Sequence, residues 1–231
     1  MKLMKFTLSA PLQSWGEDAR WDYRATAVMP TKSAIIGLLG CCLGIFRGDE
    51  RLNRLDKLLR VAVRADQPGR VMTDYQTVHS LDETPLLTAN GGHRKKGEGL
   101  VTPKQYLQDA RFTVFLWGDE ETLNACFQAM AHPKWAVYLG RKSCVPAVPV
   151  KPVWMEADTP EDAVARFTEE ERQRCEAIAH VEMDALPNEE LKAGQRMITR
   201  HDTLLRADRN EYTVRWVKAF AVQSGGENPC T

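Results

Sequence analysis

PTKSAIIGLLGCCLGI, residues 30–45, begins with a polar turn and continues as an apolar run. Thr31 is a favoured N-cap residue, so the stretch predicts a helix. Gly37, Gly40 and Gly44 recur at spacings of three and four and therefore share one helical face. Because an interior glycine costs about 1 kcal/mol relative to alanine, this bare face indicates a close approach, either of the sheet or of a nucleic-acid backbone. Packing on the sheet is the commoner cause.

Helix and strand patterns alternate through the first two thirds of the chain. Their order is strand, two helices, two strand patterns around the turn Gln67-Pro68-Gly69, strand, helix and strand. This order predicts an α+β fold built on a β-α-β-β-α-β, ferredoxin-like unit, which is the architecture of RNA-recognition-motif domains. The expected strands are 2–10, 60–66, 71–78, 110–118 and 148–154, and the expected helices are 30–45, 49–60 and 119–132.

The sequence changes character near residue 153 and becomes acidic and proline-broken. A helix is expected at 160–175, and short antiparallel strands are expected around 176–183, 194–201 and 210–220. These patterns predict a ferredoxin-like domain followed by a smaller C-terminal region. The expected bounds of the two units are 1–152 and 153–231.

Residues 79–103 interrupt the first unit. They contain ANGGHRKKGEG (89–99), which is rich in glycine and cations and poor in apolar anchors. The segment therefore predicts a mobile insertion without a regular element. Its candidate contacts to phosphate or to an acidic surface are His93, Arg94, Lys95 and Lys96.

Composition indicates a soluble, cytoplasmic globular protein. The chain has 231 residues, 43% of them hydrophobic, which is enough for an ordinary core. We find no run of 18 uncharged apolar residues and no signal-peptide core in MKLMKFTLSAPLQSW (1–15). The six cysteines show neither a C-x-x-C pair nor a matching histidine spacing, so we expect no metal site, disulfide framework or cofactor.

Charge is distributed unevenly although the formal net charge is zero. Residues 1–155 carry 21 Lys and Arg against 15 Asp and Glu, whereas residues 156–231 carry 10 against 16. A basic part followed by an acidic part suits a protein that binds a polyanion with one region and turns another toward partners. Ordinary surface variation is the alternative explanation.

The start of the helix at 30–45 could hold an anion. Lys32 and Ser33 resemble the end of a P-loop, but the glycines that a P-loop needs before the lysine are missing, which excludes a nucleotide site of that kind. The unpaired N–H groups of a first helical turn, with Thr31, Lys32 and Ser33 beside them, still predict a phosphate seat. The alternative is that Thr31 only caps the helix.

Three further motifs carry polar or aromatic side chains suited to RNA. LQSWG (12–16) and DYQTV (74–78) each place an aromatic ring beside hydrogen-bonding groups, and such rings stack on the bases of single-stranded RNA. YLGRKSC (138–144) forms a basic turn that can hold one phosphate. Trp15 could equally be a core residue, and the turn could be merely solvated. The candidate residues are Gln13, Ser14, Trp15, Tyr75, Thr77, Gly140, Arg141, Lys142 and Ser143.

Metal-free RNA cleavage needs a base that activates the 2′-hydroxyl and an acid for the leaving oxygen. Of the five histidines, only His79 lies near a plausible site. We include His79 among the candidate RNA contacts, but no spacing indicates an acid–base pair, so we expect no catalytic residue.

Five motifs together resemble the CasD family, the RAMP subunits that hold the 5′ handle of the guide RNA in the type I-E CRISPR complex Cascade. They are LQSWG, PTKSAIIGLLGCCLGI, DYQTVHS, YLQDARFTVFLWGD and YLGRKSC, and they occur in the family's order over about two thirds of the chain. RNEYTVRWV resembles the closing strand of the family more faintly. Ala10 and Gln76 depart from the family's usual glycine and frequent histidine.

The resemblance implies a ferredoxin-like RAMP domain with a β-hairpin thumb at 79–103. The thumb would press against the guide RNA where handle meets spacer and would touch the adjacent backbone subunit, while Thr31, Lys32 and Ser33 would lie near the handle. The family's members are non-catalytic RNA-binding subunits in antiviral defence. Their implied partners are the guide RNA, the backbone subunit, the large subunit and other members of the complex, with target DNA indirectly and no membrane.

Two other functions stay open at this point. The first is metal-independent endoribonuclease activity on CRISPR repeat RNA, as in type I-C-like relatives that use a tyrosine, a lysine and a histidine. The second is a generic RNA-recognition module outside CRISPR systems, which would require all five motifs to be accidental.

Overall fold

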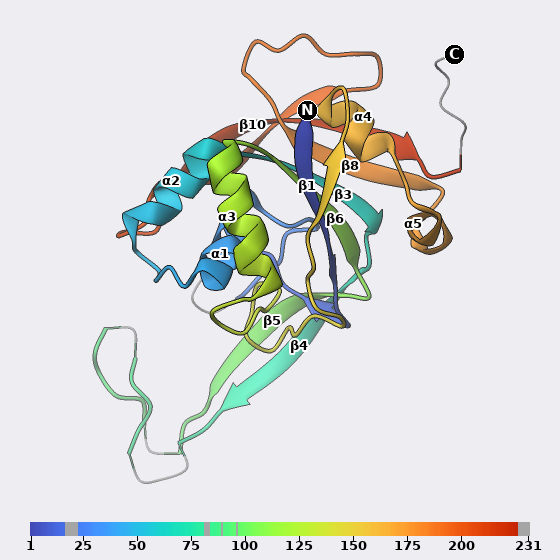
Figure 1. The fold of residues 1–231 in the computed structure, drawn as a ribbon. Coiled ribbons are helices and arrows are strands. Elements are labelled where there is room, and N and C mark those ends of the chain that lie inside the picture. The colour runs from blue at the N-terminus through green and yellow to red at the C-terminus, as the bar shows by residue number, and fades with distance from the viewer. Residues whose placement is uncertain (17–22, 81–83, 89, 96, 226–231) are drawn as a thin grey trace.

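A computed structural model describes residues 1–16, 23–80, 84–88, 90–95 and 97–225. The strands form a seven-stranded sheet and a three-stranded sheet, and helices lie on both faces of the larger one (Figure 1). The predicted α+β class with antiparallel sheets is confirmed. The helices are α1 (Lys32–Leu43), α2 (Glu50–Leu58), α3 (Glu120–Ala131), α4 (Pro160–Ala165) and α5 (Glu169–Arg174). The strands are β1 (Lys2–Ser9), β2 (Leu12–Gln13), β3 (Leu59–Gln67), β4 (Arg70–Val78), β5 (Leu100–Gln108), β6 (Arg111–Gly118), β7 (Val153–Glu156), β8 (Ile178–Asp184), β9 (Arg196–Arg206) and β10 (Glu211–Gln223).

The large sheet has the strand order β7-β1-β6-β3-β8-β10-β9, and every neighbouring pair is antiparallel. Strand β7 pairs with β1 at one edge, whereas β8 joins the sheet on the other side through β3. Strands from both sides of the expected boundary at residues 152 and 153 therefore share one sheet. The boundary itself stays a prediction.

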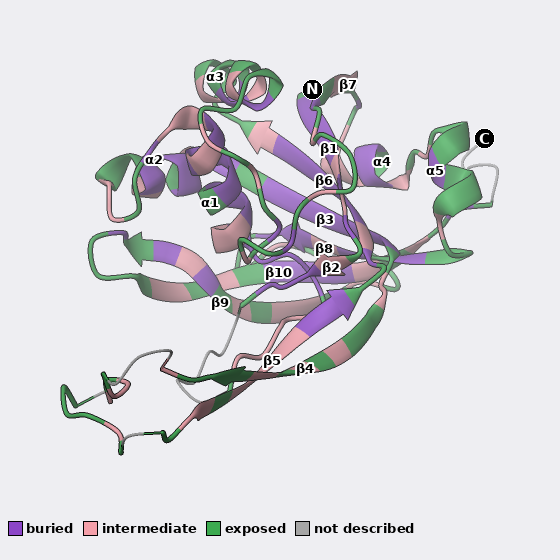
Figure 2. Cartoon of the chain, turned by 90° about the horizontal axis from the view of Figure 1, so that it is seen from below, coloured by how far each residue is buried: buried purple, intermediate pink, exposed green. Residues whose placement is uncertain are grey.

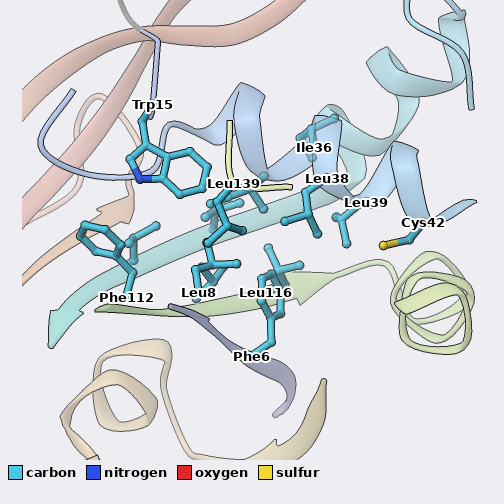
Figure 3. Close-up of a cluster of buried hydrophobic side chains, with 14 of the residues drawn as sticks. Phe6, Leu8, Trp15, Ile36, Leu38, Leu39, Cys42, Phe112, Leu116 and Leu139 are labelled. Carbon is cyan, nitrogen blue, oxygen red and sulfur yellow. The ribbon is translucent and has the colours of Figure 1, made fainter. Parts of the chain in front are cut away.

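Two hydrophobic cores lie on opposite faces of this sheet. The larger one packs β1, β3 and β6 against α1, α2 and α3, and Figure 3 shows Phe6, Leu8 and Leu116 pointing into it. The smaller one packs Ala62, Phe115 and Val181 against α4 on the other face. The alternation of side chains along each strand supplies both cores, because neighbouring residues point to opposite faces.

The helix at 30–45 begins as predicted. Thr31 is the N-cap, and its Oγ1 accepts a hydrogen bond from the Ala34 N–H at 3.3 Å. The expectation that three glycines serve one close approach is wrong, because each glycine has a different environment. A Cβ on Gly40 would lie 2.6 Å from Leu52 Cδ2, and Gly44 ends the helix with φ of +69°. Gly37 is exposed, and no described atom outside its two neighbours and the backbone of α1 lies within 4 Å of its Cβ position.

Strands β3 and β4 do not pair with each other as a hairpin, although they flank the predicted turn. β3 pairs with β6 and β8, whereas β4 pairs with β5 in the three-stranded sheet β2-β5-β4. The β4–β5 ribbon leaves the body of the molecule, and β4 is largely exposed (Figures 1 and 2). The segment without regular structure that was predicted at 79–103 ends before residue 100, because β5 begins at Leu100.

The single helix expected at 160–175 is two short helices, α4 and α5. The Arg64 guanidinium donates to the carbonyl oxygens of Val164 at 2.8 Å and Arg166 at 2.9 Å, which a continuous helix would need for its own hydrogen bonds. Thr168 then starts α5 with a capping box to Glu171. Among the described residues, no helix is long and apolar enough to cross a membrane.

Candidate nucleic-acid interface

A groove of about 840 Å³ lies beside the exposed side of α1. One wall is α1 itself, a second wall is the segment that follows α3, and the end of the β9–β10 pair closes the third side. The residues that line it and matter below are Ser33, Gly37, Cys41, Phe46, Arg47, Trp135, Tyr138, Gly140, Lys142, Asn210 and Tyr212.

Aromatic rings form one side of the groove. Phe46 is 71% exposed, and its ring centroid lies 4.9 Å from that of Trp135 at an interplanar angle of 52°. Tyr138 is 38% exposed. Exposed rings of this kind can stack on splayed bases of single-stranded nucleic acid.

Cationic side chains lie beside these rings. Lys142 is exposed, and its ammonium has no hydrogen-bond or ion-pair partner within the part of the chain that the structure describes. Arg47 is also exposed, and its Nε donates to Asn210 Oδ1 at 2.8 Å. The groove therefore combines stacking surfaces with positive charge, which is the combination that single strands require.

The basic turn predicted at 140–143 is held against β2. Gly140 has φ of +90°, and a Cβ there would overlap the carbonyl oxygen of Ser14. The Ser14 N–H donates to the Leu139 carbonyl at 3.1 Å. The Cys144 N–H donates to the Arg141 carbonyl at 2.8 Å and so closes the turn. The turn thereby presents Lys142 and Ser143 to solvent from a fixed base.

Arg141 has a structural role that the sequence did not indicate. Its Nη1 donates to the Gln105 carbonyl and its Nη2 to the Arg24 carbonyl, both at 3.0 Å. The guanidinium also lies 4.6 Å above the centre of the Tyr106 ring. These bonds use one N–H of each terminal nitrogen to fasten the turn to β5 and to the segment at Arg24, and the phosphate contact of Arg141 stays a prediction.

The predicted phosphate seat at Thr31 and Lys32 is corrected, because the protein's own carboxylates occupy it. Lys32 is 6% exposed, and its Nζ lies 3.4 Å from Asp184 and 3.8 Å from Asp56. Its backbone N–H donates to Asp202 Oδ2 at 2.8 Å. Thr31 is buried and caps α1, which was the alternative explanation, while Ser33 is half-buried and faces the groove.

The pKa values of two acids near Lys32, Asp56 and Asp202, are shifted in opposite directions. Burial raises the pKa of Asp56 to about 6, although Lys32 opposes the change. Burial would also raise the pKa of Asp202, but the hydrogen bonds from Arg215, at 2.8 and 2.7 Å, hold it below its ordinary value. Asp184 also accepts from Arg215. This buried network joins α1, α2, β8, β9 and β10, and it engages Lys32 with the protein's own carboxylates at the start of α1.

The first aromatic motif belongs to the core. Trp15 is 1% exposed and points into the larger core beside Leu139 (Figure 3). Gln13 is fully buried and donates to the Ala110 carbonyl at 2.6 Å, and Ser14 is 3% exposed. The direct RNA contacts predicted for Gln13, Ser14 and Trp15 are therefore corrected, since their side chains lie beneath the surface.

The remaining candidates lie along the β4–β5 ribbon and its tip, apart from the groove. Tyr75 is 70% exposed, and Thr77, His79, His93 and Lys95 are also exposed. Arg94 forms an ion pair with Glu98 at 2.9 Å. Lys96 lies outside the described residues.

Phe46, Trp135, Asn210 and Tyr212 were missed by reasoning from the sequence. Phe46 and Trp135 sit in segments with no RNA-binding motif, and their positions relative to α1 depend on the fold. Asn210 and Tyr212 belong to the RNEYTVRWV stretch, which offered a faint signal through its resemblance. Within the described ranges, no cluster of three His, Cys, Asp or Glu could hold a metal ion.

The fold resembles those of solved chains from CRISPR systems. A solved chain titled "CRISPR RNA-guided surveillance complex" superposes with a TM-score of 0.71 at 29% identity, covering 96% of this chain and 89% of the other. A second, titled "Crystal structure of Cas protein", superposes with a TM-score of 0.62 at 25% identity, covering 96% and 95%.

The sequence comparisons define the family. The family described as CRISPR-associated protein (Cas_Cas5) matches residues 3–218, so the chain belongs to it. The curated relative "CRISPR system Cascade subunit CasD" of Escherichia coli (strain K12) is 34% identical over an alignment of 174 residues, and the match covers 69% of this chain and 74% of that relative. The resemblance in the five motifs is thereby confirmed.

Proposed function

We propose that this protein is a non-catalytic guide-RNA-binding subunit of a type I-E Cascade complex, in which it caps the 5′ handle of the RNA. The observation that carries the proposal is the groove beside α1, where exposed aromatic rings and the unpartnered Lys142 lie together in a member of a CRISPR-associated family. The relative named as a Cascade subunit supports the assignment to such a complex.

We further propose that residues 1–152 form a ferredoxin-like RAMP unit with an inserted thumb, followed by a smaller region at 153–231. The order β7-β1-β6-β3, with α1 and α2 between β1 and β3 and with α3 between β6 and β7, supports the β-α-β-β-α-β arrangement. The projecting β4–β5 ribbon supports a thumb whose tip is at 79–103. Its exposed Tyr75, Thr77 and His79 are then the candidates for the junction of handle and spacer.

The proposed partners follow from this assignment. The guide RNA occupies the groove, the thumb touches the adjacent backbone subunit, and other surfaces meet the large subunit and the remaining members of the complex. Target DNA is reached indirectly through the guide. Exposed Lys95 at the tip of the ribbon supports a contact with phosphate or with an acidic surface.

The arrangement of the ribbon favours binding over RNA cleavage. Tyr75 pairs with Pro103 and Asp74 pairs with Lys104 across β4 and β5, so Tyr75 and Lys104 point to opposite faces of the ribbon. A mechanism that uses a tyrosine, a lysine and a histidine together would need them on one face.

We expect the purified protein to leave CRISPR repeat RNA intact both in EDTA and with added Mg²⁺. The reason is that we find no acid and base placed together to act on a 2′-hydroxyl among the residues that the structure describes. Denaturing gels of labelled repeat RNA test this, with a mock purification as the control for contaminating nucleases. Specific cleavage that disappears in His79→Ala would overturn the non-catalytic assignment and favour the endoribonuclease.

Lys142→Ala should weaken RNA binding and reduce the slope of log affinity against log salt by about 0.7, the single-strand value for one phosphate contact. Fluorescence anisotropy with the handle RNA at several salt concentrations measures the slope. Lys192→Ala, which removes an exposed lysine outside the groove, is the matched control and should leave the slope unchanged. Equal slopes for Lys142→Ala and wild type would place Lys142 on the solvated surface.

A further inference from the structure

The position of Phe46 is unusual for a large apolar side chain, because it is 71% exposed and yet firmly placed. Ile45 N–H donates to the Gly40 carbonyl at 2.8 Å, and Asp49 N–H donates to the Phe46 carbonyl at 3.2 Å. These bonds fix the backbone on both sides of the ring, and Trp135 supports it from the side. The backbone that carries the ring is therefore fixed and Trp135 contacts the ring, which lowers the entropy lost on stacking.

The facing wall of the groove is equally fixed. Lys134 N–H donates to the Cys42 carbonyl at 2.9 Å, and Cys41 Sγ donates to the Ala136 carbonyl at 3.4 Å. These contacts tie the segment after α3 to the end of α1. The groove is thus a preformed feature of the fold and does not depend on a side chain rearranging.

Gly37 leaves the middle of α1 bare within this groove. It is exposed, its φ is not in the left-handed region, and no described atom outside its two neighbours and the backbone of α1 lies within 4 Å of its Cβ position. Neither packing nor backbone conformation requires glycine here, and glycine is unfavourable inside a helix. A ligand that crosses α1 in contact with its backbone is a physical reason for the bare position.

The groove's size and chemistry select the ligand. About 840 Å³ is within the range of roughly 300–1,000 Å³ that holds small organic ligands. A flat ring can stack on Phe46 only if it has left a helical stack, since a duplex presents base edges rather than base faces. The exposed Lys142 at the same groove can neutralise the attached phosphate.

We propose that the groove holds one unstacked nucleobase of the bound RNA, stacked on Phe46, with its sugar–phosphate backbone passing over Gly37 toward Lys142. The inference rests on the proposed function in taking the ligand to be single-stranded RNA. It adds the position of one base, with Phe46 as the residue on which the base stacks and Gly37 as the residue that leaves room for the backbone.

The test uses the full-length protein and a set of handle RNAs that each carry 2-aminopurine at one position. We expect its fluorescence to change strongly at one position on binding. Phe46→Ala should abolish that change and weaken binding about 5- to 140-fold, the equivalent of the roughly 1–3 kcal/mol of one base–aromatic stack. Phe46→Trp should retain both signal and affinity. Leu186→Ala, which removes a 56% exposed apolar side chain elsewhere, is the matched control.

A substitution at Gly37 tests the proposal independently. Gly37→Leu should fold with an unchanged or raised Tm, because leucine favours helices, and should lose the base-specific signal. If RNA binds but no position responds, or if Phe46→Ala or Gly37→Leu keeps the full response, the base pocket is wrong while the proposed function stands. If wild-type protein binds no handle RNA at all, the proposed function fails and the base pocket fails with it.

Discussion

Lys32→Ala is expected to lower the free energy of unfolding by about 3–5 kcal/mol, the usual cost of removing one partner from a buried charge network. Lys32 is 6% exposed and lies between Asp56 and Asp184, and its loss leaves the buried Asp56 without its ion-pair partner, whereas Asp184 keeps the bond from Arg215. Urea denaturation followed by circular dichroism measures the change. Lys142→Ala, an exposed lysine, should change stability by no more than about 0.5 kcal/mol.

The deficit of Lys32→Ala should shrink as the pH falls from 7 to about 6 and then level off. The pKa of Asp56 is about 6 in the folded wild type, where burial raises it and Lys32 lowers it, so removing Lys32 raises it further and the folded variant takes up the proton at a higher pH than the folded wild type. Protonation then removes one of the uncompensated charges. If Lys32→Ala kept wild-type stability and instead reduced the slope of log RNA affinity against log salt, the network would be unimportant for folding. Lys32 would then contact a phosphate directly, as the sequence predicted.

Gly140→Ala is expected to destabilise the protein by roughly 2–5 kcal/mol, combining about 1–2 kcal/mol for a left-handed backbone with about 1–3 for overpacking. Gly140 has φ of +90°, and a methyl group there would overlap the Ser14 carbonyl oxygen. The turn must therefore move away from β2, and it takes the Lys142 side of the groove with it. Thermal unfolding and RNA affinity should both report the change.

Gly194→Ala is the matched control for this substitution. Gly194 also has a left-handed φ, +82°, but no described atom lies within 4 Å of its Cβ position. Gly194→Ala should lower the free energy of unfolding by only about 1–2 kcal/mol, the cost of a left-handed backbone conformation. Equal destabilisation by Gly140→Ala and Gly194→Ala would mean that the contact with Ser14 contributes nothing to the fold.

The sequence predicted those features that local chemistry decides. Thr31 marked the start of α1 because a threonine side chain can accept a helix N–H, and Leu3, Phe6 and Leu8 marked β1 by their pattern along an extended chain. Residues 79–103 were predicted to be an excursion because they are rich in glycine and cations, although the ribbon that leaves the body already includes β4. In each case the signal lies within about ten neighbouring residues.

Features that depend on distant residues could not be predicted. Nothing near Lys32 shows that Asp56, Asp184 and Asp202 converge on it, since they come from α2, β8 and β9. Trp15 could have been a surface ring or a core residue until the fold placed it under Leu139. The groove itself exists only because α1, the segment after α3 and the β9–β10 end meet in space.

The most direct measurement is photo-crosslinking in the assembled complex, using guide RNA with 4-thiouridine in its 5′ handle and mass spectrometry of the linked peptides. The proposed function predicts crosslinks from handle nucleotides to this chain, in the peptides that contain Phe46, Tyr138 or Lys142. Crosslinks near Tyr75 are expected at the junction of handle and spacer. Handle nucleotides that crosslink only to other subunits of an intact complex would contradict the assignment of this protein as the subunit that binds the handle.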